Sequence, residues 1–134
     1  MTRTNFPHST RLLWILLAVG LALMLGCGRS VPPEADPDKA RSALASALDA
    51  WKNGKPFDAL HGASPPVYLN DPQWQQGRRL LDYQLEPDSE QRHGCGLRYT
   101  VVLSLEDRKG NSVQRKVLYQ IHTESAIVIT PADL

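Results

Sequence analysis

The feature that most constrains the fold of this chain is a change of hydrophobic period at residue 79. From there onward apolar and polar residues alternate, which is typical of β-strands that have one face in a core. Three alternating runs each place a set of apolar residues on one face: Leu81, Tyr83 and Leu85; Leu97, Tyr99, Val101, Leu103 and Leu105; and Val113, Val117, Tyr119 and Ile121. A fourth run, at 126–130, is β-branched through its centre. The short connections at 107–111 and 124–125 predict antiparallel hairpins.

One amphipathic helix is predicted before the strands. Asp36 can accept hydrogen bonds from the free backbone N–H groups, Pro37 suits the first helical position, and Asn53 with Gly54 supplies a stop. Between these signals, the following apolar residues recur at helical spacing: Ala40, Ala43, Leu44, Ala47, Leu48 and Trp51. The pattern predicts a helix with one face in the core of its own domain, although such a face could also bind a partner.

The helix and the strands together predict an α+β fold: one N-terminal amphipathic helix packed on a four-stranded antiparallel β-meander. Between them, Asp71 and Pro72 repeat the helix-start signal, and Trp74 would hold this short helical turn against the core. In element order alone, over residues 36–132, this plan is similar to the cystatin-like and NTF2-like folds. No function follows from that similarity.

The N-terminus carries a membrane-targeting pattern. Arg3 and Arg11 precede an apolar run at 12–26, which as a helix would be roughly 22 Å long, shorter than the ~30 Å hydrocarbon core of a bilayer. The run ends in Met24-Leu25-Gly26-Cys27, which resembles the lipobox of bacterial lipoprotein precursors. The resemblance implies that residues 1–26 are a signal peptide, that Cys27 is lipidated on its sulfur, and that 27–35 form a tether. An ordinary secretory signal and a short uncleaved anchor are the alternatives.

The chain that would remain after cleavage is small and nearly neutral. Removing residues 1–26 from the 134 leaves 108, which suits the single domain predicted at 36–134. Because Arg3 and Arg11 would be lost, 13 Lys and Arg would face 14 Asp and Glu, so we expect no nucleic-acid partner. By the lipoprotein resemblance, the absence of Asp after Cys27 favours the outer membrane, facing the periplasm, in a host with two membranes.

Signals for chemistry are sparse. His93 and Cys95 lie two residues apart, but a zinc site needs three or four ligands and a cysteine nucleophile needs an oriented base. We therefore interpret them as part of a glycine-flanked loop that starts a strand. An acidic run lacks the pattern of a calcium loop and is interpreted as a solvated face: Asp82, Glu86, Asp88 and Glu90. No metal, cofactor or catalytic residue is predicted.

Two groups of residues could form sites. Tyr83, Tyr99 and Tyr119 all fall on the core-facing phase of their strands and could line a ligand pocket, although buried core aromatics would show the same pattern. On the opposite phase, the apolar residues that interrupt polar positions are Leu80, Val102 and Leu118. These three could contact a protein partner or a second copy of the chain.

The sequence therefore predicts a lipid-anchored cell-envelope protein whose domain acts by binding or scaffolding, without catalysis. The alternative is a small hydrolase or isomerase that uses a cavity between helix and sheet, with Asp82 or His122 beside the tyrosines. An inhibitor of the cystatin kind is a third possibility, but the Gln-x-Val-x-Gly hairpin typical of that family is absent.

Overall fold

A computed structural model describes residues 28, 31 and 33–132 of the chain. The chain divides into two units, Met1–Val31 and Pro32–Leu134, and only the second contains described secondary structure. Its elements, in order, are α2 (Pro37–Lys52), β1 (Val67–Leu69), α3 (Pro72–Gln75), β2 (Leu80–Leu85), β3 (Gln91–His93), β4 (Gly96–Glu106), β5 (Ser112–Thr123) and β6 (Ile127–Ala132). No helix among the described residues has the length and apolar character needed to cross a membrane.

Helix α2 begins and ends where the sequence signals predict. The Asp36 carboxylate accepts hydrogen bonds from the backbone N–H groups of Asp38 and Lys39, Pro37 is the first helical residue, and Asn53 is the C-cap. Gly54 follows with a φ of +74°, a conformation that costs glycine little because it has no Cβ. All six apolar residues predicted to face the core are buried, so the predicted helix and its face are confirmed.

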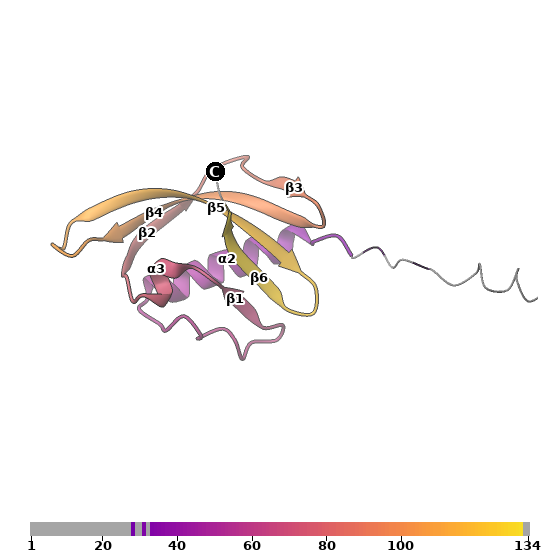
Figure 1. Ribbon diagram of the computed structural model, residues 1–134, viewed down its shortest axis with the longest axis horizontal. Coiled ribbons are helices and arrows are strands. Elements are labelled where there is room, and N and C mark those ends of the chain that lie inside the picture. Colours follow the sequence, from indigo (N-terminus) through magenta and orange to yellow (C-terminus); the bar gives the residue numbers. More distant parts are fainter. Residues whose placement is uncertain (1–27, 29–30, 32, 133–134) are drawn as a thin grey trace, which may run out of the picture. The chain divides into compact units, whose positions relative to one another are not determined.

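The sheet differs from the predicted four-stranded antiparallel meander. It has six strands, with the order β1-β6-β5-β4-β2 and with β3 paired to β4, and it is mixed because β1 runs parallel to β6. Figure 1 shows this sheet curling over one side of α2. The α+β class is therefore correct, and the strand count and the purely antiparallel pairing are wrong. The two additional strands have three residues each, which is too short for an alternating pattern to be recognised.

The core lies between α2 and the concave face of the sheet. Leu44 and Leu48 of α2 are fully buried, as are Tyr99 and Tyr119 on the sheet. At the C-terminal end of α2, the Trp51 ring stacks on Trp74 of α3, with ring centroids 5.7 Å apart and planes 13° apart. Trp74 is buried, which confirms that it fastens the short helix α3 to the core.

Strand β2 changes phase at its second residue. Leu80 pairs with Leu105 and Asp82 pairs with Ser104, so Leu81 is an extra residue in the ladder. A bulge of this kind turns the residue before it to the other face of the sheet. As a result Leu80 is 1% exposed and belongs to the core, and Leu81 is only half-buried. The prediction that Leu80 lies on the outer face is wrong for this reason.

Candidate functional site

The three tyrosines face the core as predicted, but their hydroxyl groups go to three different carboxylates. Tyr83 donates to Asp49 of α2 at 2.8 Å, and Tyr99 donates to Glu90, before β3, also at 2.8 Å. Tyr119 donates to Asp71, the N-cap of α3, at 2.5 Å. Each hydroxyl is therefore satisfied by a separate segment, and the three do not converge on one ligand as a shared pocket would require.

These contacts perturb the ionisation of all three tyrosines. Burial, followed by the bonded carboxylate, raises the pKa of Tyr83 and of Tyr99 to about 12. The pKa of Tyr119 is raised further, chiefly by its burial and then by the charge of Asp71. The hydroxyls therefore stay protonated at neutral pH and act as hydrogen-bond donors.

Asp82 and His122, the residues predicted for the alternative enzyme site, contact side chains other than the three tyrosines. Asp82 Oδ1 lies 3.0 Å from Lys52 Nζ in an exposed ion pair, and His122 lies next to Cys95. The Lys52 ion pair also contributes to holding the pKa of Asp82 below its usual value, through a hydrogen bond and then through charge. Neither side chain forms a hydrogen bond with a tyrosine hydroxyl among the residues described.

The outer face of the sheet keeps two of the three apolar residues predicted there. Val102 and Leu118 are half-buried and diagonal to each other: Leu118 pairs with Thr100, and Val102 pairs with Lys116. Because Leu80 is in the core, the predicted patch is reduced to these two residues. Cys27, the predicted lipidation site, lies outside the described residues.

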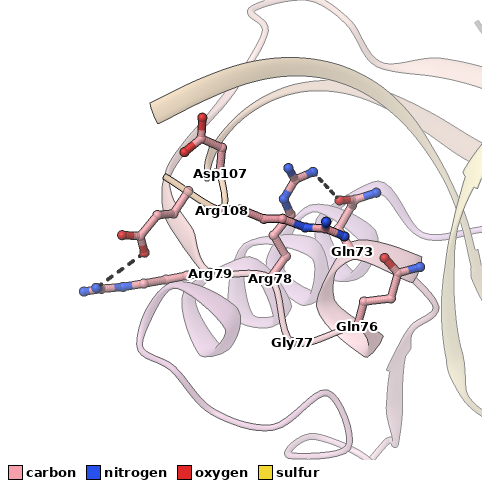
Figure 2. A pocket seen from close by; sticks show the side chains of 8 residues that line it. Gln73, Gln76, Gly77, Arg78, Arg79, Asp107 and Arg108 are labelled. Carbon is pink, nitrogen blue, oxygen red and sulfur yellow. Dashed lines mark hydrogen bonds and ion pairs between the residues drawn. The ribbon is translucent and has the colours of Figure 1, made fainter. Parts of the chain in front are cut away.

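A pocket of about 510 Å³ lies between the end of α3, the start of β2 and the turn of the β4–β5 hairpin. Three arginines line it, Arg78, Arg79 and Arg108, together with Gln73, Gln76, Gly77, Glu106 and Asp107. Gly77, with a φ of +78°, ends the short helix and directs the chain into β2, so Arg78 and Arg79 are placed at the rim. Figure 2 shows Arg78 directed toward Gln73 and Arg79 extending the opposite way.

Arg78 is fixed at both its backbone and its side chain. Its carbonyl oxygen accepts a hydrogen bond from Trp51 Nε1 at 2.7 Å, and its guanidinium Nη1 donates to Gln73 Oε1, also at 2.7 Å. The backbone of Arg79 is paired with β4, because Glu106 N donates to the Arg79 carbonyl oxygen at 3.0 Å. These bonds join the β4–β5 turn to the α3–β2 connection and so assemble the pocket.

The two carboxylates in the pocket do not neutralise all three arginines. Glu106 Oε2 lies 3.7 Å from Arg79 Nη1. Asp107 Oδ1 instead accepts the backbone N–H groups of Lys109 and Asn111, both at 2.8 Å, and the bond from Asn111 contributes most to holding the pKa of Asp107 below its usual value. Among the described residues, Arg78 and Arg108 have no ion pair within 4.0 Å, and the charge of Arg78 acts on Asp107 only from a longer distance, as a minor cause of its lowered pKa. The pocket therefore presents guanidinium groups, whose geometry matches that of a carboxylate or a phosphate.

Sequence reasoning missed this pocket. Gly77-Arg78-Arg79 and the basic turn at 108–109 are visible in the sequence, but about thirty positions separate them. Only the pairing of β2 with β4 brings the two segments together. The sequence also did not predict that the Cys95 side chain lies beside His122. His93, two residues before Cys95, is exposed.

Comparisons with known proteins returned no relatives. No family model matches the chain, and no curated protein and no solved structure matches it. Within the described part of the chain, no group of three or more His, Cys, Asp and Glu residues is placed to hold a metal ion.

Proposed function

We propose that this protein is a lipid-anchored cell-envelope protein whose domain binds an anionic group of a partner, without catalysis. The predicted lipobox ending at Cys27 supports the anchor. The observation that carries the binding role is the pocket in which Arg78 and Arg108 have no ion-pair partner among the described residues. Arginine keeps its charge at all physiological pH values and does not transfer protons, so these side chains suit binding better than acid–base chemistry.

The position of the pocket in the domain agrees with this proposal. Ala35 N donates to the Cys95 carbonyl oxygen at 2.8 Å, which fixes the entering chain at the start of β4. The arginine pocket lies at the other end of β4, an 11-residue strand, on the order of 35 Å away. Figure 1 shows the β4–β5 hairpin extending at the end opposite the N-terminus of α2. A partner would therefore reach the pocket far from the point where the tether joins the domain.

Three further predictions remain part of the proposal. Location at the outer membrane follows from the lipoprotein resemblance. A relation to cystatin-like or NTF2-like folds is supported by a helix held in a curled sheet.

Val102 and Leu118 are proposed to contact a protein partner or a second copy, and the oligomeric state of the Val102→Lys, Leu118→Lys variant would test this.

The anchor is tested by metabolic labelling with a fatty-acid analogue in a bacterial host. The wild type should be labelled and Cys27→Ala should lose the label completely, because the thioether to lipid needs the Cys27 sulfur. Cys95→Ala is the matched control, since it removes the other cysteine and should leave the label unchanged. Equal labelling of wild type and Cys27→Ala would contradict the anchor and leave the pocket unaffected.

The pocket is tested by calorimetric titration with pyrophosphate and with a glutamate-rich peptide, which separate phosphate from carboxylate recognition. Changing Arg78 and Arg108 to Gln should weaken binding by about 100-fold, or about tenfold for each lost charge–charge contact of roughly 1.4 kcal/mol. Binding by the wild type should also weaken as salt is raised.

The matched control for the pocket is the double variant Arg41→Gln, Arg92→Gln. These two arginines are exposed, and they pair with Glu90 and Glu34, away from the pocket. The control should bind both probes like the wild type. If the two double variants lost affinity equally, general charge would explain the binding and the pocket would be refuted.

A further inference from the structure

Cys95 and His122 form a side-chain pair that the proposed binding role does not use. Cys95 Sγ lies 3.8 Å from His122 Nδ1, across the start of β4 and the end of β5. Gly96 makes this approach possible. A Cβ on Gly96 would lie 2.9 Å from both His122 Cε1 and the Ile121 carbonyl oxygen, so a side chain there would press on the imidazole and on the backbone of β5.

A chain of hydrogen bonds determines which imidazole nitrogen faces the sulfur. Arg98 Nε donates to Gln120 Oε1 at 3.2 Å, which turns the amide NH₂ of Gln120 toward His122 Nε2, 3.1 Å away. Because Nε2 accepts that hydrogen bond, the neutral imidazole carries its proton on Nδ1. That N–H is directed at Cys95 Sγ.

This arrangement differs from that of an inert core cysteine. Cys95 is only half-buried, and the residues before it, His93 and Gly94, are exposed, so the residue lies near the surface of the domain. Reactive thiols are typically partly exposed and lie beside a donor that stabilises negative charge on sulfur, whereas structural cysteines are buried among apolar groups. Activated nucleophiles usually have a neighbouring group that a third group orients. Here Cys95 is the nucleophile, His122 is its neighbour, and Gln120, held by Arg98, orients His122.

We propose that Cys95 is a reactive thiol that exchanges with disulfides and that His122 promotes its attack. The Cys95 sulfur attacks one sulfur of a disulfide R–S–S–R, so that a Cys95–S–S–R bond forms and the R–S–S–R bond breaks. The proton that Cys95 loses on forming the thiolate goes to water, the Nδ1–H of His122 stabilises the thiolate, and the leaving R–S⁻ takes up a proton from water. One disulfide is consumed and one is formed, so no additional oxidant is needed.

The test measures formation of the mixed disulfide between full-length protein and glutathione disulfide. Digestion and mass spectrometry follow the Cys95 peptide separately from the Cys27 peptide. In the folded wild type, Cys95 should react at least about tenfold faster than in the same protein unfolded in urea. His122→Gln should lower the folded-state rate about tenfold, because it removes the N–H beside the sulfur and retains a polar side chain of similar length.

Two variants complete the test. His93→Gln is the matched control: it removes the histidine nearest to Cys95 in sequence and should leave the rate unchanged. Gly96→Ala keeps every polar group, but its Cβ would press on the imidazole and on the Ile121 carbonyl oxygen, so it should slow the reaction as His122→Gln does provided that the fold is retained. Near-ultraviolet circular dichroism confirms the fold of each variant. The proposal would be overturned if Cys95 of the wild type reacted no faster in the folded protein than in the unfolded protein. It would also be overturned if folded His122→Gln reacted at the wild-type rate.

Discussion

Replacing Trp51 with alanine should lower the free energy of unfolding by about 3 to 5 kcal/mol, the usual range for removing a large buried aromatic side chain. Trp51 is 2% exposed, stacks on Trp74 and donates its indole N–H to the Arg78 carbonyl oxygen. The substitution removes all three interactions and leaves a cavity between α2 and α3. It should also loosen the backbone of Arg78 and so weaken anion binding at the pocket.

The measurement is urea denaturation of the wild type and the variant. The two free energies of unfolding are compared where both proteins show the same m-value, the slope of free energy against urea concentration. Phe57→Ala is the matched control, because Phe57 is an aromatic residue close to Trp51 in sequence but is 42% exposed. It should change the stability by no more than about 0.5 kcal/mol. A loss below about 1 kcal/mol in Trp51→Ala would show that the two-tryptophan stack is not a main part of the core.

Much of the fold could be predicted from the sequence because its signals are local. Asp36, Pro37 and Asn53 mark the ends of α2 by their own hydrogen-bonding properties. The alternating run of β4, and that of β5 from Val117 onward, fix which face each side chain occupies, whereas Val113, predicted to face the core, is 45% exposed. What failed depended on distant partners. Strand β1 exists because Val67–Leu69 pairs with β6, and the strand itself is too short to give a pattern.

The bulge in β2 shows the same limit at a single residue. The alternation of Leu81, Tyr83 and Leu85 predicts that Leu80 faces outward, yet the ladder admits one extra residue and Leu80 turns inward. Nothing in the local sequence marks this position, because the choice depends on which of the two leucines packs better on the core. The sequence alone therefore misassigned both leucines: Leu80 belongs to the core, and Leu81, predicted to face it, is not among the residues that pack against it.

The candidate sites were harder to predict than the fold. That the tyrosines face inward follows from alternation, but their carboxylate partners come from α2, from the segment before β3 and from the cap of α3. The arginine pocket and the Cys95–His122 pair each join residues that become neighbours only through strand register. Pairings of this kind need the register of the sheet, which hydrophobic alternation leaves undetermined.

Asp71→Ala should cost about 2 to 4 kcal/mol, because this one side chain stabilises two elements. Its Oδ1 accepts the backbone N–H of Gln73 and caps α3, and its Oδ2 accepts the hydroxyl of Tyr119. Loss of the cap costs about 1 kcal/mol, and an unsatisfied buried hydroxyl costs about 1 to 3 kcal/mol. Asp71 is 2% exposed, so water cannot readily replace either contact.

A double-mutant cycle with Tyr119→Phe isolates the hydroxyl–carboxylate contact. Tyr119→Phe keeps the ring and removes only the hydroxyl, so the double variant should be less destabilised than the sum of the two single variants by about 0.5 to 3 kcal/mol. Asp38→Ala is the matched control: Asp38 is an exposed aspartate in the first turn of α2, and it should not couple to Tyr119. Strict additivity of Asp71→Ala and Tyr119→Phe would show that the contact contributes nothing to stability.

Alkaline pH tests the same contact from the side of Tyr119. Folding raises the pKa of Tyr119 above its ordinary value of 10.0, so its contribution to stability is complete below about pH 10, where both states hold the proton. Above that pH the unfolded chain loses its phenolic proton first, and stability falls as pH rises. Tyr83 and Tyr99 contribute a similar fall between about pH 10 and pH 12. The free energy of unfolding of Tyr119→Phe should therefore decline less steeply with pH above pH 10 than that of the wild type. If both declined equally, the Tyr119 hydroxyl would have the same pKa in the folded and unfolded chain, as a solvent-exposed tyrosine does.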